Sequence, residues 1–339
     1  MIKTNISIFF VAIFSLLAFS VNAHAQVTSN DAAPVHIPLV MSQTRSGTYK
    51  ANINIGIGDM QPAPFAFDTG STGLHVFAAA NLDAPGSGVQ CSKTPISFTV
   101  GNPGRVTYSG VICYAPLHFD TYTTPVSVAI AYLTSATCAN ANPNCKIPDL
   151  NSPKAHGGVY GVFGAGLTGP MPIPSPLLTL PAPYSTYSIT LTHGEGELVL
   201  GEGAPPNATQ FPLAPGKHQG EKWEKGQTCL FVNQHPVGTC LAISFDTGNG
   251  VPWIRGANTN TIPHADGLVA TGTSIGFGPP EAAKQATSII AGTSFADRIK
   301  LQPAKGAALT NVGIAAFFNH IVTYDNDNGM ISVAPRSAN

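Results

Sequence analysis

The stretch Phe65-Ala66-Phe67-Asp68-Thr69-Gly70-Ser71 returns in altered form as Ile243-Ser244-Phe245-Asp246-Thr247-Gly248-Asn249. Each copy is an apolar run that ends in Asp-Thr-Gly. One such triplet says little, because Asp and Gly are common turn formers that end strands in many proteins. Two copies that lie 246 − 68 = 178 residues apart say more, since each can occupy its own lobe of ordinary domain size. The duplication therefore predicts two similar halves with a cleft between them.

Two aspartates delivered by two similar halves form a candidate paired-carboxylate site. If Asp68 and Asp246 face each other, they cannot both ionise readily, so the pair holds a single proton over an acidic window. The ionised carboxylate can then activate a water molecule while the protonated one acts as the acid, and either aspartate can hold the proton. Hydrolysis of peptide bonds is the reaction that this pair favours.

Further blocks along the chain give it a resemblance to the pepsin-like aspartic proteases. They occur in the family's order, at 47–58, 62–64, 161–164, 197–201, 312–318, 321–325 and 331–335. The resemblance implies an all-β, bilobal fold, with an N-terminal lobe at 26–190 and a C-terminal lobe at 191–339. It also implies an aspartic endopeptidase that acts on peptides or unfolded proteins and prefers apolar side chains beside the cleaved bond.

Composition and periodicity predict the same fold class without the resemblance. The chain holds 35 Gly and 29 Pro, and its apolar residues recur in short alternating runs. At 49–57 they alternate with Lys50, Asn52 and Asn54, which is the period-two pattern of a half-buried strand. Helix candidates are few, at 280–286 and 314–318. We therefore expect an all-β protein with occasional short helices.

The resemblance also assigns supporting roles to the residues that follow each aspartate. Thr69 and Thr247 would join the two loops by hydrogen bonds and keep the carboxylates coplanar. Gly70 and Gly248 would let backbone amides approach the acids closely, because glycine has no side chain.

Two positions near the aspartates depart from the family's pattern. Ser71 fits the residue that donates a hydrogen bond to the outer oxygen of Asp68, but Asn249 stands where the second copy usually has Ser or Thr. An amide can still donate that bond. His75 stands where members of the family commonly have Trp, and we expect it in the hydrogen-bond path to the flap that covers the substrate. Such a change could shift the pH range of the chemistry.

The flap itself is expected between Phe98 and Tyr114, around the turn signal at 101–104. We assign Tyr108 as the flap tyrosine. The alternative is that Tyr108 is a strand residue that packs on its neighbours.

Six cysteines fall into three neighbouring couples, which suits disulfides in an exported chain. Sequential pairing is expected because it closes short loops and keeps each bridge within one lobe: Cys91–Cys113, Cys138–Cys145 and Cys229–Cys240. The first bridge would brace the flap at its base. A metal site is not expected, because the chain has no Cys-x-x-Cys or His-Glu-x-x-His and its histidines are scattered. No cofactor is predicted.

The first residues indicate export. Lys3, an apolar run from Ile6 to about Val21 and the small residues before 26 predict a signal peptide at 1–25, cleaved after Ala25. The alternative is an uncleaved membrane anchor, for which the run is short. The stretch 26–46 contains a single strongly basic residue, Arg45, so we expect no removable inhibitory prosegment of the family's kind. These features together suggest a bacterial protein of the periplasm or the cell exterior.

Charge argues against several classes of partner. The net charge is −1 and charged residues make up 10% of the chain, against a usual value of about a quarter. No basic stripe is present, so nucleic acid is not an expected partner. We expect a monomer with no stable membrane association after signal cleavage.

Two rival functions belong to other classes. The stretch 272–276 matches Gly-x-Ser-x-Gly around Ser274, with Asp297 and His320 following in serine-hydrolase order. That elbow needs a helix directly after the serine, and the Pro-containing residues 277–280 follow instead. The second rival is a non-catalytic pepsin-like binding protein, which Asn249 and His75 favour and which both retained Asp-Thr-Gly triplets oppose.

Overall fold

The structure of the protein is a computed structural model. It describes residues 33–101, 105–139, 145–169, 172–217, 222–256, 259–281, 285–294, 297–303 and 307–336. The expected signal peptide at 1–25 lies outside them. So do most of the expected flap turn at 101–104 and the middle of the helix candidate at 280–286.

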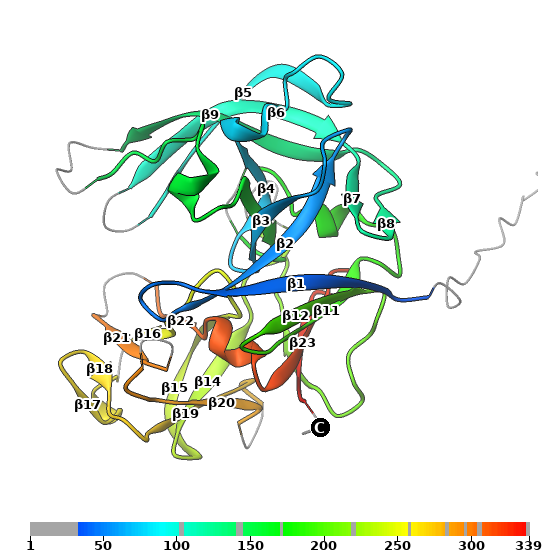
Figure 1. Ribbon diagram of the computed structural model, residues 1–339. Helices are drawn as coiled ribbons and strands as arrows, with labels where there is room; N and C mark the ends of the chain where they lie inside the picture. Colours follow the sequence, from blue (N-terminus) through cyan, green and yellow to red (C-terminus); the bar gives the residue numbers. More distant parts are fainter. Residues whose placement is uncertain are drawn as a thin grey trace, which may run out of the picture. The chain divides into compact units, whose positions relative to one another are not determined.

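Strands dominate this part of the chain and form two sheets (Figure 1). Within the described residues the larger sheet has fifteen strands: β1 Val35–Gln43, β2 Tyr49–Ile57, β3 Ala63–Asp68, β4 Thr72–Phe77, β5 Gln90–Val100, β6 Val106–Ala115, β7 Leu117–Phe119, β8 Tyr122–Thr123, β9 Val128–Cys138, β10 Gly161–Ala165, β11 Thr186–Leu191, β12 Glu195–Leu200, β13 Thr209–Pro212, β23 His320–Asp325 and β24 Met330–Pro335. Its order is β13-β24-β23-β11-β12-β1-β2-β3-β10-β4-β9-β6-β5, with β7 and β8 paired beside β2.

The smaller sheet has nine strands within the described residues: β14 Gln227–Val232, β15 His235–Ser244, β16 Trp253–Arg255, β17 His264–Ala265, β18 Leu268–Val269, β19 Ser274–Gly278, β20 Thr287–Ile290, β21 Lys300–Gln302 and β22 Leu309–Asn311. The described helices are all short 3₁₀ turns: η1 Ala78–Ala80, η2 Pro153–His156, η3 Pro176–Thr179, η4 Thr259–Thr261 and η5 Ile314–Phe317. The predicted all-β class is confirmed, and the helix candidate at 314–318 is the single 3₁₀ turn η5.

The alternation read from the sequence accounts for the strand β2. Ala51, Ile53 and Ile55 are buried, while at the alternate positions Lys50 and Asn54 are exposed and Asn52 is half-buried. Since successive side chains of a strand point to opposite faces, this pattern gives one face to the core and the other to solvent. Ile57 and the preceding glycine are also buried, where β7 pairs with the end of β2.

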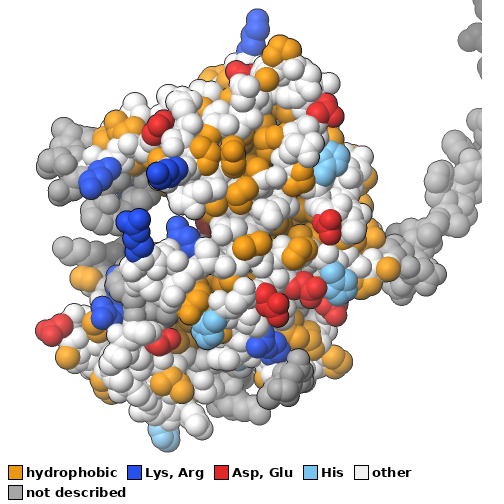
Figure 2. All heavy atoms as spheres, in the orientation of Figure 1, with side chains coloured by type: hydrophobic (Ala, Val, Ile, Leu, Met, Phe, Trp, Pro, Cys, Tyr) orange, Lys and Arg blue, Asp and Glu red, His pale blue; other side chains and the backbone are white. Residues whose placement is uncertain are grey.

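Strands from the beginning, middle and end of the described chain lie side by side in the larger sheet. The strand β1 pairs with β12, β12 with β11, and β11 with β23, so these segments form a platform shared by the two lobes (Figure 1). Strands β2 to β10 make the N-terminal lobe and β14 to β22 the C-terminal lobe, and the surface is hollowed between them (Figure 2). The boundary predicted at 190/191 stays a prediction; it falls inside β11.

Both lobes repeat one arrangement of three strands. In the N-terminal lobe β10 lies between β3, to which it is parallel, and β4, to which it is antiparallel. In the C-terminal lobe β22 lies between β15 and β16 with the same two directions. Asp68 is the last residue of β3, and Asp246 follows the end of β15 by two residues. The duplicated sequence motif therefore builds two equivalent strand ends.

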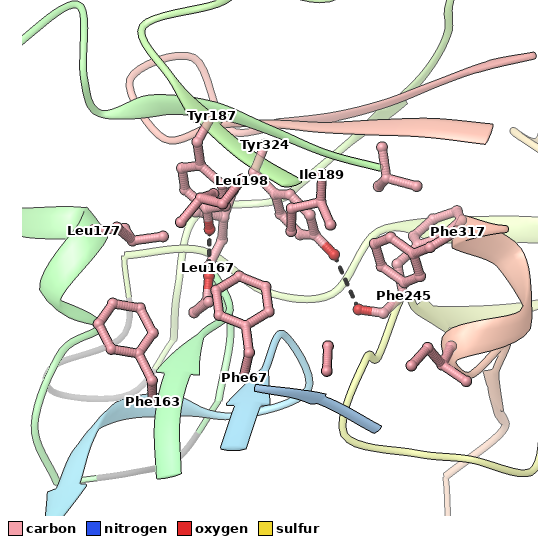
Figure 3. Close-up of a cluster of buried hydrophobic side chains, with 14 of the residues drawn as sticks. Phe67, Phe163, Leu167, Leu177, Tyr187, Ile189, Leu198, Phe245, Phe317 and Tyr324 are labelled. Atoms are coloured by element: carbon pink, nitrogen blue, oxygen red, sulfur yellow. Dashed lines mark hydrogen bonds between the residues drawn. The ribbon is translucent and has the colours of Figure 1, made fainter. Parts of the chain in front are cut away.

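Two tyrosines of the shared platform are bonded to the chain next to these strand ends. The rings of Tyr187 and Tyr324 are stacked with centroids 5.1 Å apart, and both side chains are fully buried (Figure 3). The Tyr187 hydroxyl donates a hydrogen bond to the carbonyl of Ala165 at the end of β10. The Tyr324 hydroxyl donates to the carbonyl of Phe245, 3.0 Å away, just before Asp246.

Candidate active site

Reciprocal hydrogen bonds join the two Asp-Thr-Gly loops. The backbone amide of Thr69 donates to Oγ1 of Thr247 over 3.1 Å, and the amide of Thr247 donates to Oγ1 of Thr69 over 3.0 Å. Each hydroxyl then donates across to the other lobe, from Thr69 to the Phe245 carbonyl and from Thr247 to the Phe67 carbonyl, both over 2.8 Å. Both threonines are buried, so this pairing is shielded from water. The structure thus brings the two predicted threonines together.

Each glycine of the two triplets lies against the carboxyl group of the opposite lobe. A Cβ atom added to Gly70 would collide with the carboxyl of Asp246, and one added to Gly248 would collide with the carboxyl of Asp68. Glycine is therefore required at both places for the two carboxyl groups to approach. This approach is between lobes and adds to the predicted approach of backbone amides, which the amide of Gly70 makes to Asp68.

Asp68 accepts a hydrogen bond on each of its oxygens. The backbone amide of Gly70 donates to Oδ1 over 2.8 Å, and the hydroxyl of Ser71 donates to Oδ2 over 2.7 Å. Ser71 thus occupies the place that the resemblance gives it. Both donors stabilise a negative charge on Asp68.

Asp246 is held by a residue that the sequence did not single out. Nδ2 of Asn311, on β22, donates to Oδ2 of Asp246 over 2.5 Å. The expectation that Asn249 makes this bond is wrong, because its Nδ2 donates instead to the carbonyl of Val251 and to Oδ1 of Asn311. Among the described residues, Oδ1 of Asp246 is buried and has no hydrogen-bond partner.

Burial and charge together shift the titration of this pair. Burial raises the pKa of Asp246 well above its usual range, and the nearby charge of Asp68 raises it further. The hydrogen bond from Asn311 and the positive charge of Lys225 act in the opposite direction. Asp246 can therefore keep its proton at pH values where an ordinary carboxyl has lost it.

A small apolar pocket adjoins Asp68. It has a volume of about 210 Å³ and is lined by Asp68, Ser71, His75, Phe77, Phe98, Val100, Tyr108, Leu133 and Val162. Tyr108 lies on β6 opposite Phe98 of β5, and the two rings stack with centroids 5.9 Å apart. The β5–β6 hairpin thus carries Tyr108 to the same pocket as the first aspartate.

His75 reaches this pocket by packing rather than by hydrogen bonds. Its side chain is 4% exposed, its ring lies 4.8 Å from that of Phe98, and burial lowers its pKa to about 4. The expected hydrogen-bond path from His75 to the flap is wrong, because Nε2 is buried and without a partner among the described residues. The ring packs instead against Phe98 of the β5–β6 hairpin.

Three disulfides join the couples that the sequence suggested: Cys91–Cys113, Cys138–Cys145 and Cys229–Cys240. The first links β5 to β6 below Tyr108, at the base of the hairpin. The second closes the end of β9, and the third links β14 to β15. No free cysteine occurs in the described part of the chain.

The serine-hydrolase alternative gains no support from the arrangement of its three residues. Ser274 is the first residue of strand β19, where a hydrolase elbow needs a turn from a strand into a helix. Asp297 accepts a hydrogen bond from Ser294 at 2.5 Å, and Nδ1 of His320 lies 3.1 Å from the carbonyl of Ala316. No hydrogen bond links Ser274, Asp297 and His320 within the ranges given above.

The described residues contain neither a candidate metal site nor a candidate membrane-spanning helix. No group of three or more His, Cys, Asp or Glu side chains is placed to hold a metal ion. None of the described helices has the length and apolar character needed to cross a membrane.

Asn311 is the functional residue that sequence reasoning missed, although the repeated strand plan contains a signal for it. Val162 opposes Ala66 two residues before the first aspartate, and Asn311 opposes Ser244 two residues before the second. The two residues thus occupy the same place in the two lobes. An asparagine at a position whose counterpart is an apolar residue points to a specific polar partner.

No family model and no curated protein matches this chain by sequence. Its structure is similar to solved structures that include the aspartic proteinase from Irpex lacteus, with a TM-score of 0.59 at 14% sequence identity. That alignment covers 90% of this chain and 98% of the other. At this level of identity the likeness shows the fold alone. The chain therefore has the bilobal, all-β fold of the pepsin-like aspartic proteases.

Proposed function

We propose that this protein is an aspartic endopeptidase in which Asp68 and Asp246 activate a water molecule between them. The observation that carries the proposal is the reciprocal bonding of Thr69 and Thr247, which brings two carboxyl groups from separate lobes against each other's glycines. The apolar pocket beside Asp68 suits an apolar side chain next to the cleaved bond.

The chemistry follows from one shared proton. The ionised carboxylate takes a proton from the water molecule while the oxygen of that water bonds to the peptide carbonyl carbon. The protonated carboxyl gives its proton to the carbonyl oxygen. The resulting tetrahedral diol collapses as the carboxyl that took the water's proton gives it to the amine nitrogen, the other carboxylate takes a proton from a diol hydroxyl, and the C–N bond breaks. Two carboxyl groups and one proton suffice for each turnover, so we propose no metal or cofactor.

The raised pKa of Asp246 sets the direction of the pH dependence. Activity needs one proton on the pair, so it falls at low pH when both acids are protonated. It falls again at high pH when Asp246 loses its proton, and the raised pKa moves that upper limit toward neutrality. We therefore expect a bell-shaped profile in the acidic to near-neutral range.

We further propose export to the periplasm or cell exterior of a bacterium, as a monomer without nucleic-acid or stable membrane partners. The three disulfides support an oxidising compartment. The basic and apolar start of the sequence supports a signal peptide at 1–25. Residues 35–43 pair with two other strands as β1, which supports the view that this stretch is part of the enzyme and not a removable prosegment.

The test is cleavage of an unfolded protein between about pH 3 and pH 7 by the mature chain. Asp68→Asn and Asp246→Asn should each abolish cleavage while circular dichroism and thermal unfolding stay close to those of the parent. Unchanged activity in both variants would refute the aspartic mechanism. A folded parent that cleaves nothing at any pH, yet binds peptides, would favour the non-catalytic binding role.

A further inference from the structure

A chain of two asparagine side chains connects the backbone of the second loop to Asp246. Asn249 donates to Oδ1 of Asn311 over 2.9 Å, and Asn311 donates to Oδ2 of Asp246 over 2.5 Å. Asn311 is 7% exposed, so its bonds are shielded from water. We call Asn249 and Asn311 the asparagine relay.

Backbone groups fix the direction of the relay. The amide of Gly313 can only donate, and it donates to Oδ1 of Asn311 over 2.9 Å. The carbonyl of Val251 can only accept, and Nδ2 of Asn249 donates to it over 3.0 Å. Either side chain, if flipped, would set two donors or two acceptors against each other. Nδ2 of Asn311 must therefore face Asp246.

This direction decides which oxygen of Asp246 can carry a proton. Because Oδ2 receives an N–H from Asn311, and a carbonyl-type oxygen accepts such a bond better than a hydroxyl oxygen does, a proton on Asp246 is favoured on Oδ1. Oδ1 is the buried oxygen without a hydrogen-bond partner among the described residues. An unpaired buried acceptor is unfavourable, and a proton would let Oδ1 donate a hydrogen bond to Asp68.

Asp68 is bonded differently. Both of its oxygens accept hydrogen bonds, from the Gly70 amide and the Ser71 hydroxyl, and the amide can only donate. Among the described residues, Asp68 therefore accepts one hydrogen bond on each oxygen, whereas Asp246 accepts one on Oδ2 alone. The relay is also specific to the second lobe, since Val162 holds the place of Asn311 in the first.

We infer that Asn311, oriented by Asn249, is a positioning residue that leaves Oδ1 as the oxygen of Asp246 that carries the shared proton and that limits how strongly Asp246 holds this proton, so that Asp246 can act as the acid. This assignment of roles rests on the proposed function. The effect of Asn311 on the proton does not, because it can be measured without turnover.

The ionisable groups that act on Asp246 come from three other elements. They are Asp68 from the first loop, Lys225 before β14 and Tyr324 from β23. Burial raises the pKa of Asp246, and the Asn311 bond limits that rise. Removing the Asn311 donor should therefore raise the pKa of Asp246 further while the other three groups stay in place.

The test is a carboxyl titration by NMR with ¹³Cγ-labelled aspartate in the Asp68→Asn chain, where Asp246 titrates without its partner's charge. Adding Asn311→Leu should raise the titration midpoint of Asp246 by about one pH unit, since a hydrogen bond to a charged group is lost. Adding Asn249→Ala, which leaves Asn311 in place but unoriented, should give a smaller shift in the same direction. Asn249→Ala also keeps the test available if Asn311→Leu does not fold.

Thr310→Val is the matched control. Thr310 precedes Asn311 on β22, is fully buried and donates to the carbonyl of Trp253 over 3.1 Å. Its loss should weaken the same strand without moving the Asp246 midpoint. An unchanged midpoint in both relay variants, or an equal shift in the control, would overturn the role of Asn311.

Turnover gives a second comparison. If the parent cleaves peptides, Asn311→Leu should also move the upper limb of its kcat/KM profile to higher pH. If the parent cleaves nothing, the proposed function fails while the titration still decides the role of the relay.

Discussion

At the scale of single residues, the candidate site depends on the absence of a side chain at Gly70 and Gly248. The two carboxyl groups come from loops of different lobes, and each must pass the backbone of the other loop to meet its partner. A single methyl group on either glycine would occupy the place of a carboxyl group. The Thr69–Thr247 bonds hold the backbones too firmly for the loops to separate without losing buried hydrogen bonds.

Gly70→Ala is therefore expected to lower kcat/KM by about 100-fold or more, because a displacement of about 1 Å at reacting groups has an effect of that order. The protein should still fold, as shown by its circular dichroism. Gly203→Ala is the matched control, since Gly203 is exposed and a Cβ there meets open space. Equal activity in the two variants would contradict the close approach of the carboxyl groups.

At the scale of elements, the β5–β6 hairpin is the part of the N-terminal lobe that can act on a substrate. It lies at the edge of the larger sheet and is held on one side by β9. Phe98 and Tyr108 face the pocket beside Asp68, and Cys91–Cys113 ties the two strands together at the other end. The bridge restricts the hairpin at its base, so its removal should affect the pocket.

We expect the double variant Cys91→Ala/Cys113→Ala to raise KM severalfold and to lower the free energy of unfolding by about 3 kcal/mol, as estimated from the entropy of the loop that the bridge closes. Cys229→Ala/Cys240→Ala is the control, because it removes a similar bridge between adjacent strands far from the pocket. Both variants should lose stability in urea titrations, and only the first should change KM. A similar KM in both would argue against a substrate-binding role for the hairpin.

Local sequence patterns predicted the features that are determined by residues close together in the sequence. Alternation located β2, and the repeated Asp-Thr-Gly located the two strand ends. The sequence did not predict the contact of Asn311 with Asp246, because β22 has only three residues and Asp246 lies 65 residues away. No periodicity in the sequence marks such a contact. The wrong expectations for Asn249 and His75 have one cause: a side chain's partner depends on which strand packs opposite it, and motif position does not fix that.

At the scale of the whole molecule, the two lobes share one apolar core. Buried residues of β2, β15 and the platform strands belong to a single continuous cluster, which includes Tyr187 and Tyr324 (Figure 3). The tyrosine stack joins the platform to the strand ends of both lobes through Ala165 and Phe245. A substitution that weakens the tyrosine stack should therefore destabilise both lobes. A substitution in a domain with its own separate core would destabilise that domain alone.

Tyr324→Phe tests this coupling by removing only the hydroxyl that donates to the Phe245 carbonyl. That carbonyl keeps its bond from Thr69, so the free energy of unfolding should fall by only about 1 kcal/mol. Because the core is continuous, amide hydrogen exchange through global unfolding should speed up equally in β4 of one lobe and β16 of the other. Tyr184→Phe is the control and removes an exposed hydroxyl that lies 3.5 Å from the Ala33 carbonyl. It should change neither the free energy of unfolding nor the exchange rates. Faster exchange confined to β16 would mean that the two lobes unfold separately. In that case the platform would connect two independently unfolding lobes and would not make them one cooperative unit.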